Sequence, residues 1–277
     1  MIPAATAPAT AGTLEVPGAR LYYEVRGSGP LVVLIGAPMG AAAFAPLAGL
    51  LAGDHTVLTT DPRGTGRSAV EDAGQDSTPE MRADDLSRLI AHVDAGPAAV
   101  FGSSGGAVSG LALVEAHPEQ VGVLVAHEPP LIELLDDAGH QRGLTDDIVA
   151  THQAGDRAGA WRKFLAQAGI ELPEPVFQQM FGDDRDPAVL ADDDHWFGHE
   201  LRPTTRWRPD LAVLRSSPAR VVIGIGEDST GEICDRTSRA LAAALDLEPA
   251  LFPGGHIGFA DDPAGFAPRL REVLGEG

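Results

Sequence analysis

Residues 98–109 read Ala-Ala-Val-Phe-Gly-Ser-Ser-Gly-Gly-Ala-Val-Ser, and this stretch carries the strongest structural signal in the chain. A short apolar run, typical of a buried strand, leads into Gly-Ser-Ser-Gly-Gly at 102–106, and a helical pattern follows at once. This order of strand, Gly-x-Ser-x-Gly and helix predicts a sharp turn that exposes the hydroxyl of one serine. Side chains at positions 102 and 106 would crowd the close approach of strand and helix. Ser104 is therefore the candidate nucleophile.

Short aliphatic runs alternate with helical patterns on both sides of this stretch. Because the chain contains 33 glycines, a Gly-x-Ser-x-Gly spacing alone can arise by chance, and the alternation supplies the supporting context. Repeated strand-helix-strand units predict an α/β fold with a mostly parallel central sheet and helices on both faces. The expected strands cover residues 14–16, 21–25, 31–35, 56–60, 98–101, 121–126, 220–225 and 249–252. The expected helices cover 42–51, 81–93, 107–115, 232–245 and 264–274, and a Ser77–Glu80 capping box precedes the second of them.

The composition is that of a soluble globular protein with an acidic surface. At 277 residues, the chain accommodates one large α/β domain with an insertion, or two small domains. The formal net charge of -20 provides no basic surface for phosphates, so nucleic acid is not an expected partner. Cys234 is the only cysteine, which excludes an internal disulfide and a cysteine-based metal cluster. The expected partner is a small molecule, and no metal is expected.

Neither targeting nor membrane segments are expected. Residues 1–12 have no Lys or Arg ahead of a leucine-rich run and do not resemble a signal peptide. Residues 30–53 carry no charge and are long enough to span a bilayer, but prolines and glycines divide them into a strand, a loop and a short helix. We therefore expect a loose N-terminal tail and a cytoplasmic protein, either monomer or homodimer.

The alternation of strands and helices stops between residues 129 and 208. This region has helical patterns and three tryptophans, but no aliphatic run typical of a buried strand. Residues 129–208 are therefore expected to form an inserted helical cap. Residues 1–128 and 209–277 are expected to form the α/β core.

Two aromatic positions of the expected cap have different interpretations. Phe164 has helical spacing from Trp161, which favours a place in the core of the cap. Trp196 lies near the return from cap to core, where an aromatic side chain either contacts substrate or packs the cap onto the core. Trp196 is therefore kept as a possible substrate contact.

Reactive side chains follow the expected strands at their carboxyl ends, where ligands bind in an open α/β sheet. Ser104, Glu128, Asp228 and His256 each come shortly after a strand. An acyl-transfer site needs a nucleophile, an imidazole base, a carboxylate that orients the imidazole, and main-chain donors for the oxyanion. Candidates for all four roles are therefore present.

The chain resembles the α/β-hydrolase superfamily over nearly its full length. The resemblance is carried by residues 61–68 (Asp-Pro-Arg-Gly-Thr-Gly-Arg-Ser), by 100–106, and by 253–256 (Pro-Gly-Gly-His), in the order and spacing of that superfamily. It implies an α/β-hydrolase fold with an inserted cap. The superfamily usually carries His-Gly-x-Pro after the third strand, where this chain has Ile-Gly-Ala-Pro at 35–38. Because a proline has no amide hydrogen, the oxyanion donors are assigned to the main-chain amides of Ala37 and Gly105.

His256 is the candidate base among nine histidines, because it stands in a glycine-rich loop after the last expected strand. His195 and His199 fall in the expected cap. The loop at 61–68 is expected to be structural, with Asp61 and Arg63 holding the edge of the sheet together.

The orienting acid has three candidates. Most α/β-hydrolases place it in a Gly-x-x-Asp pattern after the strand expected at 220–225, but this chain has a serine at the corresponding position, 229. Glu227 or Asp228 can substitute for it with a shift of one or two residues. Glu128 is the rival, because it ends the strand next to the one that bears Ser104, and adjacent strands lie about 4.8 Å apart. A carboxylate at the rim of a buried strand also needs a partner, which the imidazole supplies.

The segments at 100–107, 126–130, 134–137 and 251–256 also resemble the zearalenone lactonase group, in which the triad is Ser-Glu-His. This resemblance implies Ser104 as nucleophile, Glu128 as acid and His256 as base, with Asp228 as the alternative acid. The sequence thus predicts a cofactor-independent serine hydrolase that cleaves a carboxylic ester or a lactone, including an aromatic macrolactone such as zearalenone. A carbon-carbon bond hydrolase, an acyl transferase and a ligand-binding pseudoenzyme stay open as alternatives.

Overall fold

The strands of the computed structural model, which describes residues 8–275, join one nine-stranded sheet. Its order is β1-β2-β4-β3-β6-β7-β8-β9, and β5 pairs with β2. β1 and β2 are antiparallel to their neighbours, whereas each pair from β4 to β9 is parallel. The bounds are β1 (Thr10–Val16), β2 (Ala19–Arg26), β3 (Leu31–Ile35), β4 (Thr56–Thr60), β5 (Ala69–Val70), β6 (Ala98–Ser103), β7 (Val121–His127), β8 (Arg220–Gly226) and β9 (Ala250–Phe252). The predicted mostly parallel sheet is confirmed.

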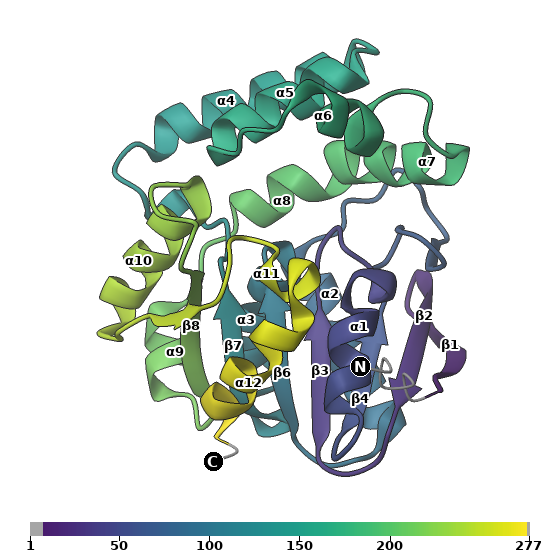
Figure 1. Cartoon of the computed structure of the whole chain (residues 1–277), viewed down its shortest axis with the longest axis vertical. Coiled ribbons are helices and arrows are strands. Elements are labelled where there is room, and N and C mark those ends of the chain that lie inside the picture. Colours follow the sequence, from purple (N-terminus) through teal and green to yellow (C-terminus); the bar gives the residue numbers. More distant parts are fainter. Residues whose placement is uncertain (1–7, 276–277) are drawn as a thin grey trace.

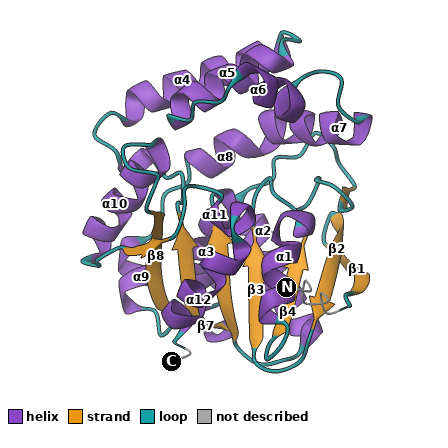
Figure 2. Ribbon diagram, viewed as in Figure 1, coloured by secondary structure: helices purple, strands orange, loops and turns teal. Residues whose placement is uncertain are grey.

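Helices cover both faces of this sheet, as Figure 2 shows. The uncharged run of β3 explains why, since alternate side chains of a strand point to opposite faces. Val33 packs in the apolar cluster under α2 and α3, whereas Val32 and Leu34 pack in the cluster under α1 and α12. The bounds are α1 (Ala41–Leu51), α2 (Pro79–Val93), α3 (Gly105–Ala116), α9 (Leu211–Ser216), α10 (Ile233–Leu245), α11 (Gly258–Asp261) and α12 (Pro263–Leu274).

A second layer of helices lies over the carboxyl end of the parallel strands (Figure 1). We call α4 to α8 the cap, and the chain enters it from β7 and returns to β8. The cap has its own apolar cluster, which includes Ile148, Trp161, Phe177 and Phe197. The bounds are α4 (Ala138–Gln153), α5 (Arg157–Ala168), α6 (Glu174–Phe181), α7 (Pro187–His195), a π-helical turn (Trp196–Glu200) and α8 (Leu201–Thr205).

Several boundaries differ from the sequence prediction. β1 begins at Thr10 because its first residues pair with the end of β2, and the two-residue β5 has no sequence signal of its own. The predicted Ser77 cap is wrong: Thr78 caps α2, because its hydroxyl accepts from the Met81 amide at 3.3 Å and Pro79 occupies the first turn. The tail expected at residues 1–12 falls partly at 1–7, outside the described residues.

Membrane insertion finds no support in the helices. None of those in residues 8–275 is long and apolar enough to cross a bilayer. The uncharged stretch at 30–53 is divided into β3, a loop and α1, as the sequence predicts.

The loop at 61–68 is held by buried charges. Asp61 accepts a hydrogen bond from the Ala41 amide at 2.8 Å and pairs with Arg67, which ties the loop to the start of α1. Arg63 forms a two-pronged ion pair with Asp85 of α2, at 2.7 and 2.6 Å, and both side chains are buried. The arginine fork matches the carboxylate geometry, so this pair fixes the loop against α2.

Replacing Asp85 with alanine leaves the buried Arg63 guanidinium without its partner. We expect the free energy of unfolding, measured by urea denaturation, to fall by about 3–5 kcal/mol. Asp84→Ala on the same helix is the matched control, because Asp84 pairs with Arg88 at the exposed surface and its loss should lower the free energy of unfolding far less. Equal losses in the two variants would contradict a structural role for the Arg63–Asp85 pair.

Candidate active site

Ser104 stands on a strained turn between β6 and α3. Its backbone has φ 56° and ψ -124°, a conformation that a residue with a side chain adopts only when its surroundings enforce it. The surroundings are tight, because a β-carbon at Gly102 would lie 2.6 Å from the Gly106 carbonyl oxygen, and one at Gly106 would lie 2.4 Å from that of Ile35. The turn thus holds Ser104 at the carboxyl end of the sheet, as the sequence predicts for a nucleophile elbow.

The two predicted oxyanion donors come together beside Ser104. Gly105 begins α3, and the first N–H groups of an α-helix have no partner within the helix. A β-carbon at Gly105 would lie only 2.7 Å from the carbonyl oxygen of Ala37, so the loop after β3 touches the start of α3. Ala37, Ser104 and Gly105 all line one pocket. The arrangement can therefore offer main-chain donors to an oxygen bound next to Ser104.

His256 contacts Glu128. The imidazole Nδ1 lies 2.5 Å from one carboxylate oxygen of Glu128, and the other oxygen accepts a hydrogen bond from the Gly226 amide at 2.8 Å. Glu128 directly follows β7 and is fully buried, with a positive φ of 53°. β7 is the parallel neighbour of β6, so the carboxylate and Ser104 start from adjacent strand ends.

The pKa values of this pair move in opposite directions. Burial alone would raise the pKa of Glu128, but the hydrogen bond and charge of His256, the charge of His127 and the Ser229 hydroxyl lower it to about 2. Burial alone would lower the pKa of His256, but Cys234 and the Glu128 carboxylate raise it well above its ordinary value. The carboxylate is therefore charged at neutral pH, and the structure favours the imidazolium that forms when the ring accepts a proton.

The other two acid candidates do not contact His256. Glu227 and Asp228 are both exposed, and no hydrogen bond or ion pair joins either side chain to His256 within the described residues. Ser229, which stands where the usual acid is expected, is buried and close enough to influence the pKa of Glu128.

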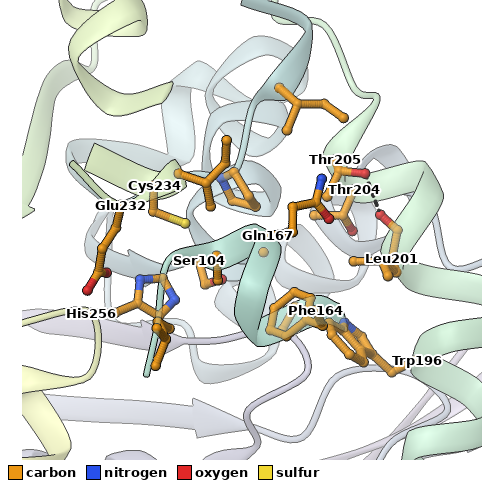
Figure 3. A pocket seen from close by; sticks show the side chains of 17 residues that line it. Ser104, Phe164, Gln167, Trp196, Leu201, Thr204, Thr205, Glu232, Cys234 and His256 are labelled. Atoms are coloured by element: carbon orange, nitrogen blue, oxygen red, sulfur yellow. Dashed lines mark hydrogen bonds between the residues drawn. The ribbon is translucent and has the colours of Figure 1, made fainter. Parts of the chain in front are cut away.

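The pocket that contains Ser104 and His256 lies between the sheet and the cap (Figure 3). The space between its walls is about 720 Å³ when the open mouth is included. Trp196 lines the pocket, and its ring stacks on that of Trp161 with 4.8 Å between the ring centroids. Trp196 is therefore both part of the pocket wall and part of the cap's apolar cluster. Phe164, expected only in the core of the cap, also lines the pocket. The apolar lining consists mainly of Ile132, Phe164, Ile170, Trp196, Leu201 and Ile233.

Sequence reasoning missed Glu232 and Cys234, which line the same pocket at the start of α10. The sequence feature that could have identified them is their position a few residues beyond β8, because ligands bind beyond the carboxyl ends of the strands in such sheets. Donor atoms of Cys234, Glu128 and His256 lie within 4.8 Å of one another, so these three residues could hold a metal ion. Glu128 and His256 are, however, joined by a direct 2.5 Å contact, which suits a shared proton between them.

The order of the strands, the strained turn at Ser104 and the inserted cap are those of the α/β-hydrolase class of enzymes. Comparison with known proteins agrees. Residues 32–269 match the model of the alpha/beta hydrolase family. The uncharacterized hydrolase YraK of Bacillus subtilis (strain 168) is 33% identical, over 95% of both chains. A zearalenone hydrolase of Bionectria ochroleuca is 26% identical, over 95% of this chain and 97% of its own. The enol-lactonase from Burkholderia xenovorans LB400 has a TM-score of 0.70 at 17% identity, over 95% of this chain and 99% of that chain.

The chain therefore belongs to the alpha/beta hydrolase family. The predicted superfamily and its fold are confirmed. The zearalenone hydrolase is a distant relative of the full chain, at 26% identity.

The contact between His256 and Glu128 predicts how His256 titrates. In an NMR titration, we expect the pKa of His256 to lie well above its ordinary value, and Glu128→Gln to lower it because the neutral amide no longer stabilises the imidazolium. Asp228→Asn is the control, since it removes an exposed charge. If Asp228→Asn lowers the pKa of His256 more than Glu128→Gln does, the assignment of the contact is wrong.

Proposed function

We propose that this protein is a cofactor-independent serine hydrolase that cleaves carboxylic esters or lactones with Ser104, Glu128 and His256. The observation that carries the proposal is the contact of His256 with the buried Glu128, in the pocket that the strained Ser104 lines. A nucleophile, an oriented imidazole and a buried carboxylate are the side-chain parts of an acyl-transfer triad. The amides of Ala37 and Gly105 complete it as oxyanion donors.

The proposed reaction follows from these positions. The Ser104 hydroxyl attacks the carbonyl carbon of the substrate while His256 takes its proton, and Glu128 holds the imidazole in the required tautomer. The oxyanion binds to the two amides, and His256 then protonates the leaving alkoxide. Water attacks the acyl-enzyme with His256 as base, which releases the acid and restores the Ser104 hydroxyl. With a lactone, alcohol and acid stay in one molecule, so the product is a single hydroxy acid.

Three observations support lactones within this class. The acid follows β7 rather than β8, the placement implied by the resemblance to the zearalenone lactonase group. The full-length relative from Bionectria ochroleuca is named a zearalenone hydrolase. The apolar lining, with Phe164 and Trp196 among it, also suits a large aromatic substrate such as a macrolactone. Trp196 is proposed as one of its contacts.

Reaction with a fluorophosphonate tests the nucleophile. We expect the Ser104 oxygen to displace fluoride and become phosphonylated, detected as a mass increase on the peptide that contains it, and Ser104→Ala to abolish labelling. Ser103→Ala is the matched control, because the neighbouring Ser103 is fully buried in β6 and its loss should leave labelling intact. Absence of labelling in the folded wild-type protein would favour a ligand-binding role without a nucleophile.

Steady-state hydrolysis of an aryl ester and an aromatic macrolactone tests the acid. Glu128→Gln should lower kcat/KM by about a thousandfold or more, because the neutral amide neither fixes the imidazole nor stabilises the imidazolium. Asp228→Asn should stay within about threefold of wild type, as expected for an exposed side chain. Loss of activity only in Asp228→Asn would overturn the triad. Labelling of Ser104 without turnover of either substrate would favour a carbon-carbon bond hydrolase or an acyl transferase.

A further inference from the structure

Among the described residues, His256 is the one basic side chain in the walls of the pocket beside Ser104, and it is already paired with the Glu128 carboxylate. Within residues 8–275, no lysine or arginine lines it, and its titratable side chains are Glu232, Cys234 and His256. The remaining walls are mainly apolar. An anion that enters this pocket loses water without gaining a permanently charged partner, which is costly.

Most polar side chains that line the pocket are already engaged with the protein. The Gln167 amide donates to the Gln141 carbonyl oxygen at 3.0 Å. The Thr204 hydroxyl accepts from Arg82 at 2.7 Å, and the Thr205 hydroxyl donates to the Leu201 carbonyl oxygen at 2.9 Å. These groups hold the pocket in shape and have few free positions for a ligand.

Glu232 differs from them. Its side chain has no hydrogen-bond or ion-pair partner in the described part of the chain, although it is half-buried. It stands at the N-cap of α10 without capping the helix by its side chain. Burial and the charge of Glu128 raise the pKa of Glu232, whereas His256 acts in the opposite direction, so its carboxyl lies within electrostatic reach of the triad. Figure 3 shows Glu232, Cys234 and His256 grouped on one side of the pocket.

The position of Glu232 matters because the start of α10 would otherwise attract anions. The N-terminus of a helix carries a partial positive charge of about half a unit. Cys234, in the first turn of α10, lines the pocket, so this end of the helix is presented to a bound ligand. A negative charge on Glu232 at the N-cap offsets that attraction and makes this side of the pocket repel anions.

We propose that Glu232 is a specificity-determining residue, whose carboxylate makes the pocket select uncharged esters or lactones and repel carboxylates. The inference rests on the proposed ester hydrolysis and adds the charge of the substrate to it. Breakdown of the acyl-enzyme breaks the bond between the Ser104 oxygen and the acyl carbon, adds the oxygen of water to that carbon, and yields an acid that ionises at neutral pH. The same charge that excludes anionic substrates therefore promotes departure of the product.

Calorimetric binding tests this without any turnover. In the Ser104→Ala background at about pH 8, where carboxylic acids are ionised, phenylacetate is compared with its uncharged methyl ketone, 1-phenylpropan-2-one. We expect the ketone to bind at least about tenfold more tightly than the carboxylate, and Glu232→Gln to reduce that preference about tenfold by strengthening carboxylate binding. Asp246→Asn at the exposed far end of α10 is the control for loss of one charge, and its preference should equal that of the parent.

The same preference in Glu232→Gln and in the parent would overturn the inference, as would a parent that binds phenylacetate as tightly as the ketone. If Glu232→Gln does not fold, Glu232→Ala gives the same comparison. Because ligand binding is measured in a variant without the nucleophile, these outcomes are independent of the fluorophosphonate and kinetic tests of the proposed hydrolysis. In the active protein, Glu232→Gln should also increase inhibition by the acid product about tenfold.

Discussion

The buried carboxylate of Glu128 is the constraint on which the site depends. An ionised carboxylate without water is stable only when hydrogen bonds and charge replace its hydration. Glu128 obtains these from the Gly226 amide on β8 and from His256 in the loop after β9. One side chain thus joins three neighbouring strand ends, and the requirement to satisfy it fixes where the imidazole lies. An apolar replacement at this position would leave the His256 imidazole without its partner as well as remove a charge.

The strained backbone at Ser104 and Glu128 is stabilised by main-chain hydrogen bonds that continue the ladder of the sheet beyond the strand ends. Ser104 and Glu128 follow adjacent parallel strands, and both have positive φ angles. The Ser104 amide donates to the His127 carbonyl oxygen at 2.9 Å, and the Glu128 amide donates to that of Gly224 at 3.0 Å. Each residue beyond a strand end is therefore bonded to the next strand in the sheet. Such conformations cost about 1–3 kcal/mol each, and main-chain bonds to rigid neighbours are what allow them to persist.

Periodicity and motif position predicted the parts of this site that directly follow regular elements or belong to a recognised motif. The aliphatic runs and the Gly-x-Ser-x-Gly turn located the parallel strands, and the rule that ligands gather beyond strand ends pointed to Glu128 and His256. Glu232 and Cys234 escaped notice because their approach to the pocket depends on the path of residues 227–231, which no periodic pattern describes. Phe164 was placed only in the core of the cap, since spacing along a helix does not reveal that one side chain also faces a pocket. The N-cap residue of α2 is Thr78 and not the predicted Ser77 for a local reason, because Pro79 occupies the first turn of the helix.

The position of the proposed acid, Glu128, and the charge of the pocket wall are connected through the start of α10. Where the usual acid is expected, this chain has the small, buried Ser229, and the carboxylate that contacts His256 comes from β7 instead. The segment after β8 therefore does not need to orient the imidazole. It places Glu232 and Cys234 in the pocket wall. The two carboxylates then have separate physical environments: Glu128 is fully buried and paired, whereas Glu232 is half-buried and unpaired within residues 8–275. The paired carboxylate of Glu128 raises the pKa of the His256 imidazole, whereas Glu232 lies in the pocket wall without a partner among the described residues. The proposed acid after β7 therefore leaves the segment after β8 available for the role that we propose for Glu232, which is to set which ligands the site accepts.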